Sequence, residues 1–149
     1  MISLVRTTSE NPDFQKLVSL LDRDLAIRDG DDHAFYDQFN KIDSIKHVIV
    51  AYQDEKPVGC GAIKSFEDGS MEVKRMYVLP EKRGLGIASK ILAGLESWAM
   101  ELGVNRLVLE TGIQQPEAIA LYTKSNYRRI ENYGQYAGIE NSLCFEKSL

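Results

Sequence analysis

The chain has 149 residues, which is enough for one domain with its own hydrophobic core. A hydrophobic content of 44% and a charged content of 27% are typical of a folded globular protein and argue against a disordered one. The net charge of −4 argues against a protein that binds duplex nucleic acid, because the phosphate backbone is usually met by a basic face. We therefore expect a single domain over residues 1–149 that has no nucleic-acid partner.

The N-terminal stretch and the two cysteines indicate the compartment. Met1–Arg6 has no charged segment followed by a long apolar run, and no apolar stretch is long enough to cross a bilayer. Cys60 and Cys144 lack CxxC spacing, so we expect two small buried residues and neither a metal site nor a disulfide. The sequence thus predicts a cytoplasmic protein without a membrane partner.

The first elements in chain order are a strand and a helix. The strand is expected over Ile2–Thr7. Asn11 and Pro12 are typical of a helix cap and of the first helical position, and the apolar residues that follow at helical spacing predict a helix ending near Arg28–Gly30.

The next stretch, Asp29–Lys41, is acidic and then aromatic. It suits a solvated loop with its aromatic residues turned inward. It also suits a lid that carries His33, Tyr36 and Asp37 to an acceptor pocket.

Three strands and a glycine-rich turn follow. Lys46–Gln53, Val58–Ser65 and Met71–Leu79 are β-branched or aromatic and are separated by turn residues, which predicts an antiparallel meander. Gly84 and Gly86 then lead into a long amphipathic helix. The free amides and the dipole of a helix start attract anions, so this turn suits a phosphate-bearing ligand.

The remaining elements complete the sheet. Arg106–Thr111 is the next strand, and the long helix before it predicts a parallel crossover from Met71–Leu79. Gln115–Lys124 suits a shorter helix, and Arg128–Tyr136 with Ser142–Glu146 a closing hairpin. This order predicts an α/β or α+β fold with a mixed sheet covered by helices.

Two motifs resemble the GCN5-related N-acetyltransferase (GNAT) superfamily. The run from Arg83 to Ala88 resembles the R/Q-x-x-G-x-G/A signature between a strand and a helix, and Ala118–Tyr127 resembles the A-x-x-L-Y-x-x-x-G-F segment. Asn126 replaces the usual glycine, and asparagine tolerates positive φ. The resemblance implies the GNAT fold: a central sheet of about six to seven strands, helices on both faces, and a splayed parallel pair after the central strand.

The resemblance also implies acetyl-coenzyme A as co-substrate, with no metal. Its pyrophosphate would lie on the amides of the turn, and its pantetheine arm on the strand before it, where a Met76 or Val78 amide could stabilise an oxyanion. The residues implied in cofactor binding are Met76, Tyr77, Val78, Arg83, Gly84, Leu85, Gly86, Ile87, Ala88 and Ser89.

Two catalytic residues are implied by position. Tyr122 falls on the family's tyrosine near the cofactor sulfur and is the candidate general acid, although its spacing also suits a core aromatic. Glu72 is the candidate base, and regular alternation would place it on one face with Lys74, Met76 and Val78. A solvent-facing or salt-bridged carboxylate is the alternative for Glu72, and Glu110 or water could take the proton instead.

The same residues also partly match two other phosphate-binding motifs. The run Gly84–Ser89 approximates a dinucleotide fingerprint, but Ser89 replaces its third glycine, and no Gly-Lys-Ser/Thr follows as in a phosphate-binding loop. A regulatory module that binds acetyl-coenzyme A without turnover stays open.

We expect transfer to a primary amine of a small molecule or amino-acid-like acceptor, with a protein or peptide N-acetyltransferase as the alternative. The resemblance implies that the closing hairpin, which includes Tyr133, Tyr136 and Glu140, helps to shape the acceptor pocket. The resemblance also suggests a homodimer.

Overall fold

The computed structural model describes residues 1–30 and 44–149, and the stretch Asp29–Lys41, for which the sequence allows a loop or a lid, lies almost entirely outside them. Its strands are β1 Ile2–Thr7, β2 His47–Gln53, β3 Lys56–Ser65, β4 Ser70–Val78, β5 Arg106–Gly112, β6 Arg128–Ile130 and β7 Ser142–Ser148. Its helices are α1 Pro12–Asp29, α3 Ile87–Glu101 and α4 Pro116–Lys124, with short 3₁₀ turns η2 Pro80–Lys82 and η3 Gly134–Tyr136.

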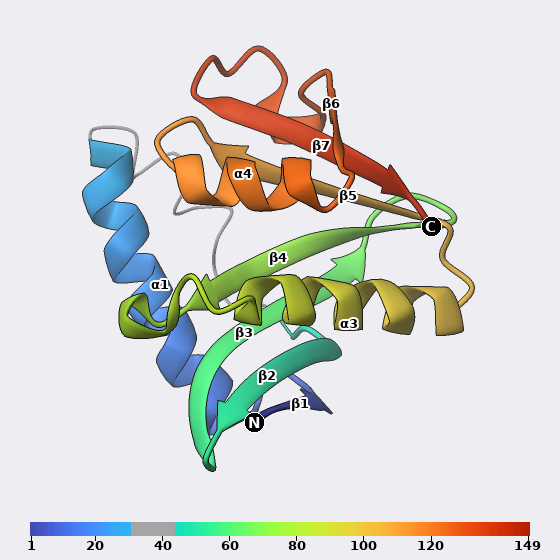
Figure 1. Cartoon of the computed structure of the whole chain (residues 1–149). Helices are drawn as coiled ribbons and strands as arrows, with labels where there is room; N and C mark the ends of the chain where they lie inside the picture. Colours follow the sequence, from blue (N-terminus) through green and yellow to red (C-terminus); the bar gives the residue numbers. More distant parts are fainter. Residues whose placement is uncertain (31–43) are drawn as a thin grey trace.

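The strands form one sheet in the order β1-β2-β3-β4-β5-β7-β6 (Figure 1). β4 and β5 are parallel, and the other neighbouring strands of the described chain are antiparallel. The predicted meander is therefore confirmed as β2–β3–β4, and the predicted crossover as β4–α3–β5. The closing hairpin is shorter than expected, because only Arg128–Ile130 pairs with β7, and the predicted strand residues up to Tyr136 end in η3.

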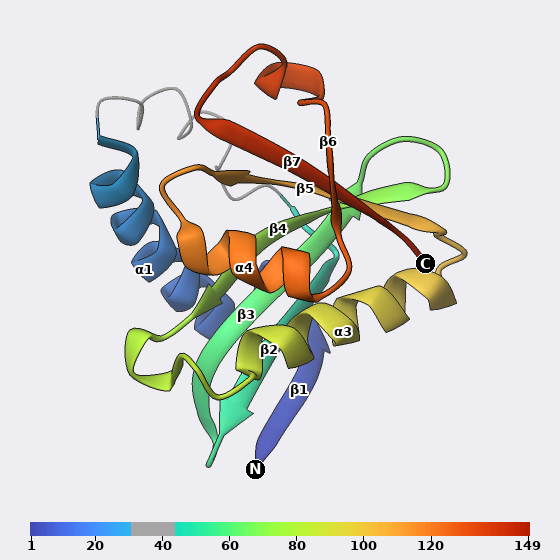
Figure 2. The same cartoon turned by 45° about the horizontal axis from the view of Figure 1, so that its top comes forward.

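Helices cover both faces of the sheet, as predicted (Figures 1 and 2). α1 buries Phe14, Leu17 and Val18 against one face, together with side chains of β2 and β3. α3 and α4 bury an apolar stripe against the other face, in a cluster that includes Ile91 and Leu95. We call these the α1 face and the α3 face.

Local sequence accounts for the start of α1 and the close approach of α3. The side chain of Asn11 accepts hydrogen bonds from the amides of Asp13 (2.8 Å) and Phe14 (3.1 Å), so the predicted cap is confirmed. On β3, a Cβ added to Gly61 would lie 2.5 Å from Met76 Sδ and 2.9 Å from Ile91. Glycine at this position therefore lets α3 lie close to the sheet.

A β-bulge at Arg75 interrupts β4. Arg75 has φ +61°, which is unusual for a residue other than glycine, and the register with β3 shifts between Lys74 and Tyr77. Met76 and Val78 consequently pack on the α3 face with Val73, whereas Tyr77 packs on the α1 face. The predicted alternation, with Glu72, Lys74, Met76 and Val78 on one face, is therefore wrong beyond Lys74.

The parallel pair β4–β5 is short. It joins only three residue pairs, from Ser70↔Arg106 to Glu72↔Val108, and the strands then diverge, as Figure 1 shows. This confirms the predicted splay. The edge of β4 that faces β5 pairs with no strand of the described chain over 73–78.

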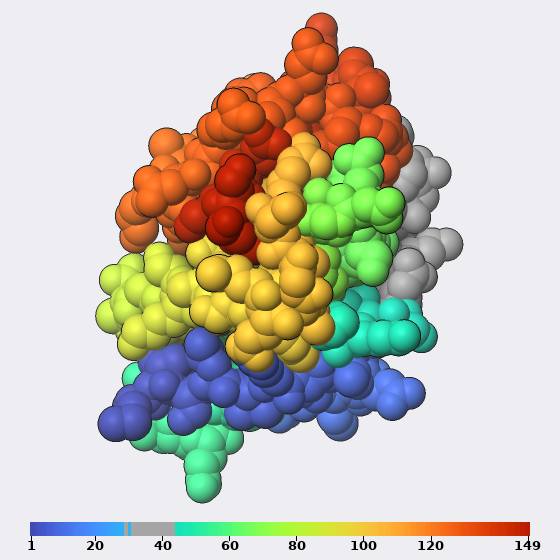
Figure 3. Space-filling model, turned by 90° about the vertical axis from the view of Figure 1, so that its right-hand side faces the viewer, coloured from blue at the N-terminus to red at the C-terminus, as the bar shows by residue number. Residues whose placement is uncertain are grey.

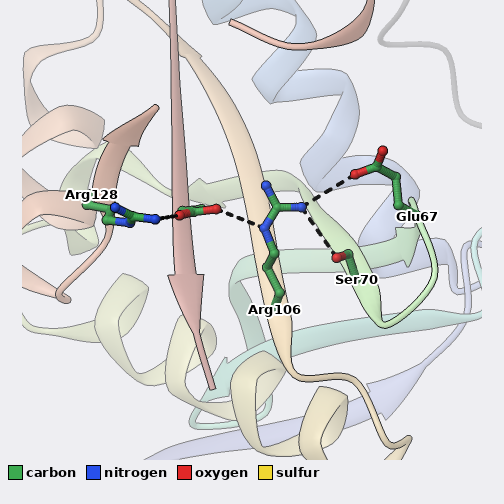
Figure 4. A network of polar contacts seen from close by, with 5 residues as sticks. Glu67, Ser70, Arg106 and Arg128 are labelled. Carbon is green, nitrogen blue, oxygen red and sulfur yellow. Dashed lines mark hydrogen bonds and ion pairs between the residues drawn. The ribbon is translucent and has the colours of Figure 1, made fainter. Parts of the chain in front are cut away.

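A polar network surrounds the end at which β4 and β5 are hydrogen-bonded, which we call the paired end (Figure 4). Arg106 donates through Nε to Glu146 at 2.8 Å and contacts Ser70 at 3.4 Å and Glu67 at 3.5 Å, and Arg128 also pairs with Glu146. The backbone continues the link, since Asn105 N donates to Gly69 O and Leu149 N to Asn105 O. Figure 3 shows these segments, in green, gold and dark red, side by side at the surface.

The two cysteines and the helices can also be compared with the sequence predictions. Cys60 and Cys144 are both free thiols and buried, as expected. Among the described residues, no helix is both long and apolar enough to cross a membrane.

Candidate active site

A cavity of about 470 Å³ opens where β4 and β5 diverge. Its walls come from both faces of the sheet. Leu21, Asp24 and Leu25 of α1 lie on one side, and Ala118, Leu121 and Tyr122 of α4 on the other. The splay therefore connects the two faces, so two substrates could meet at β4 from opposite sides.

The glycine turn forms the wall of the cavity on the α3 face. Gly84 (φ +82°) and Gly86 (φ +80°) adopt a conformation that favours glycine, and no atom lies within 4 Å of a Cβ built on either. Gly86 caps α3, and no side chain caps this helix start. Open backbone and uncapped amides fit a pyrophosphate, which accepts hydrogen bonds there and is favoured by the helix dipole.

Arg83 fastens the turn to the strand before it. Its Nε donates to the carbonyl oxygen of Val78 at 3.0 Å, and its guanidinium lies 5.5 Å from the centre of the Tyr77 ring. Arg83 and Lys82 both line the cavity. The positive charge predicted for the glycine turn is therefore present, and Arg83 also holds the turn in place.

Most of the predicted cofactor-binding residues line the cavity. Leu85 is the exception, because its side chain is 61% exposed and is not part of the wall. The predicted residues in the wall are Met76, Tyr77, Val78, Arg83, Gly84, Gly86, Ile87, Ala88 and Ser89.

Tyr122 is both a core residue and a wall residue. It is 5% exposed and packs against the rings of Tyr127 and Phe145, and it also lines the cavity. Burial, with a smaller contribution from Glu110, raises the pKa of its hydroxyl well above the ordinary value. The hydroxyl thus stays protonated at neutral pH, as a proton donor requires.

Glu72 lies outside the cavity wall. It is 5% exposed and accepts a hydrogen bond of 2.6 Å from the hydroxyl of Tyr133. Glu72 is therefore not the solvent-facing carboxylate considered above, and it forms no salt bridge with another residue that the structure describes. Tyr133, Tyr136 and Glu140, expected near the acceptor, do not line the cavity either.

The wall includes residues that the sequence motifs did not single out. Glu110, considered above as a possible base, lines the cavity together with Thr111. Lys74 and Arg75 also line it, although neither was predicted as a site residue. The bulge that brings these two cations to the wall depends on the β3–β4 register and not on a local motif.

The described residues contain no cluster of three or more histidine, cysteine or acidic side chains suited to a metal ion.

Comparisons with known proteins point to one family. The model of the acetyltransferase (GNAT) family matches residues 14–127. The IAA acetyltransferase of Azospirillum brasilense is 41% identical over 102 residues, which cover 68% of this chain and 67% of that protein.

Two solved structures extend the comparison to the whole chain. One, from Klebsiella pneumoniae, bears the name acyl-CoA N-acyltransferase, is 29% identical and has a TM-score of 0.84, with 100% of this chain and 98% of that chain covered. The other is the PaiA N-acetyltransferase from Thermoplasma acidophilum in complex with coenzyme A. It is 15% identical with a TM-score of 0.74, covers 100% of this chain and 99% of its own, and shows the shared fold alone.

Proposed function

The chain belongs to the acetyltransferase (GNAT) family and is an acetyltransferase of that family, and from this premise we propose that it transfers acetyl from acetyl-coenzyme A to a primary amine of a small molecule or amino-acid-like acceptor. The observation that carries the proposal is the cavity in the β4–β5 splay, with an open glycine turn on one side and α1 on the other. A donor and an acceptor reach β4 from opposite faces in such an arrangement.

The residues present fit the donor. The amides and glycines from Gly84 to Ser89 would hold the pyrophosphate, with Lys82 and Arg83 adding charge, and the unpaired edge of β4 would hold the pantetheine arm. When bound, acetyl-coenzyme A supplies a thioester, and transfer breaks its C–S bond, forms an amide and releases a thiol.

Two proton transfers accompany the reaction. The hydroxyl of Tyr122, which burial keeps protonated, would give its proton to the leaving sulfur. The acceptor must lose a proton, and we propose Glu110 or water as the base because Glu110 lines the cavity. Glu72 could act only through a bridging group, since it lies outside the wall.

Calorimetric titration of the full chain with coenzyme A and with NAD tests the donor. Binding of coenzyme A without binding of NAD is expected, and the reverse preference would contradict the proposal. A screen of amines, amino acids and peptides with acetyl-coenzyme A, read by thiol release, then tests turnover. Binding of coenzyme A without thiol release from any acceptor would favour the regulatory module instead.

The acceptor class separates the proposal from a protein or peptide N-acetyltransferase. Release of thiol with small amines at least as fast as with peptides is the expected result of the same screen. A cytoplasmic location, a homodimer and a single domain stay predictions from the sequence.

A further inference from the structure

The α1 side of the cavity carries two adjacent cations, Lys74 and Arg75. Lys74 pairs in register with Ala62, which packs on the α1 face, and Arg75 forms an ion pair with Asp22 of α1. Consecutive residues of a regular strand point to opposite faces. The bulge at Arg75 therefore brings both cations to one side, away from the glycine turn.

The guanidinium of Arg75 is buried and incompletely satisfied. Its side chain is 3% exposed, and Nη1 donates to Asp22 Oδ1 at 2.7 Å. Nη2 is buried and has no hydrogen-bond partner in the described chain. A buried, charged donor without a partner is unfavourable, and a residue at positive φ adds strain, so this combination points to a functional role.

Lys74 extends the same positive wall. In residues 1–30 and 44–149 its ammonium forms neither an ion pair nor a hydrogen bond. Burial lowers its pKa, while the charges of Glu72 and Glu110 act on it in the opposite direction. Glu72 is already hydrogen-bonded to Tyr133.

The acidic residues of α1 near this wall are already paired. Asp22 is held by Arg75, and Asp24 pairs with Arg28 at 3.3 Å. Arg28 also pairs with Glu117 at the start of α4. The protein thus supplies two cations to the acceptor side without a matching number of uncommitted anions from α1.

We infer that the Lys74–Arg75 wall binds a carboxylate of the acceptor, so that the acetylated amine belongs to a molecule with a free carboxylate, as in an amino acid. The planar fork of a guanidinium matches a carboxylate, and the lysine adds a point charge. The inference rests on the proposed function and narrows its acceptor from primary amines in general to carboxylated amines.

Matched acceptor pairs test the inference with the full chain. The set of L-amino acids and the corresponding L-amino acid amides share the amine and differ in the carboxylate. We expect kcat/KM from thiol release to favour at least one acid over its amide by about tenfold or more, the range of a charge-assisted hydrogen bond. Arg75→Gln should bring the two members of that pair to similar values.

Two more variants keep the test informative. Lys74→Gln removes a side chain that holds no ion pair in the described chain, so it should fold even if Arg75→Gln does not, and it should reduce the preference for the acid. Arg6→Gln is the control, because Arg6 pairs with Glu101 on the surface and stacks on Trp98. Its preference should match the wild type.

A binding measurement separates this inference from the proposed function. Calorimetric titration of the complex with coenzyme A by N-acetyl amino acids and by their amides needs no turnover. If no acceptor releases thiol, the proposed function fails, and tighter binding of the acids would still support the carboxylate site. Any one of three results would overturn the carboxylate site. These are equal use and equal binding of acids and amides, no binding of either, and a preference for the acid that survives in both Lys74→Gln and Arg75→Gln.

Discussion

At one end of the β4–β5 pair the strands are hydrogen-bonded, and Arg106 of β5 contacts both Ser70 of β4 and Glu146 of β7, whereas at the other end the strands diverge around a cavity. At the paired end, the polar side chains form hydrogen bonds and ion pairs with one another. The open end keeps an unpaired strand edge, an uncapped helix start and an unsatisfied guanidinium. We therefore expect substitutions at the open end to change binding and turnover, and those at the paired end to change stability.

The largest expected effect is at the open end, in Tyr122→Phe. Loss of a general acid should lower kcat by about 10²–10⁴-fold, with little change in the affinity for coenzyme A. Tyr127→Phe is the matched control, because the Tyr127 hydroxyl donates to Glu96 at 2.9 Å and that ring packs on Tyr122. Unchanged turnover in Tyr122→Phe would make Tyr122 a structural residue.

Gly86→Glu should weaken binding of coenzyme A by about 10²-fold, since like charges brought together cost several kcal/mol. Gly138→Glu is the control for backbone strain, because Gly138 has φ +77° with equally open surroundings outside the cavity wall. Calorimetry should find normal affinity in the control. Normal affinity in both variants would place the phosphates elsewhere.

At the paired end, Glu146→Gln should lower the free energy of unfolding by about 1–3 kcal/mol, because the 11%-exposed carboxylate accepts from Arg106 and Arg128. Urea titration measures this change. Affinity for coenzyme A should stay near the wild-type value, and a large loss of affinity would mean that the two ends are coupled.

The smallest expected effect is the pH dependence of the difference in unfolding free energy between the wild type and Glu146→Gln. The hydrogen bond from Arg106, and then Arg128, lowers the pKa of Glu146 below its usual 4.5. The unfolded chain therefore takes up this proton first, so the stabilisation is complete above about pH 4.5 and is lost as pH falls through the folded pKa. The difference in unfolding free energy between wild type and Glu146→Gln should shrink from pH 7 to pH 3. A constant difference would contradict an ionised Glu146 as the source.

The parts of the fold that depend on short stretches of sequence were predictable. Asn11 and Pro12 start α1, Gly84 and Gly86 shape the turn before α3, and Asn126 adopts φ +72° as its side chain allows. In each case the residue type alone carries the conformational preference.

Features that depend on pairing between distant strands were not predictable. A bulge at an arginine has no local signature, so Met76 was assigned to the wrong face and Arg75 was missed as a wall residue. Glu72 lies at the predicted place on β4, but its carboxylate accepts a hydrogen bond from Tyr133, which is 61 residues away in the sequence. Such partners are set by tertiary packing, which a strand pattern does not encode.

The buried cysteines have a consequence for how the enzyme can be assayed. Burial raises the pKa of Cys60 to about 12 and that of Cys144 to about 11, and the Cys60 thiol also donates to the Arg75 carbonyl at 3.3 Å. Neither is a thiolate at pH 8, the form that attacks disulfide reagents. A chromogenic disulfide added to the native protein should therefore report released coenzyme A against almost no background from the protein.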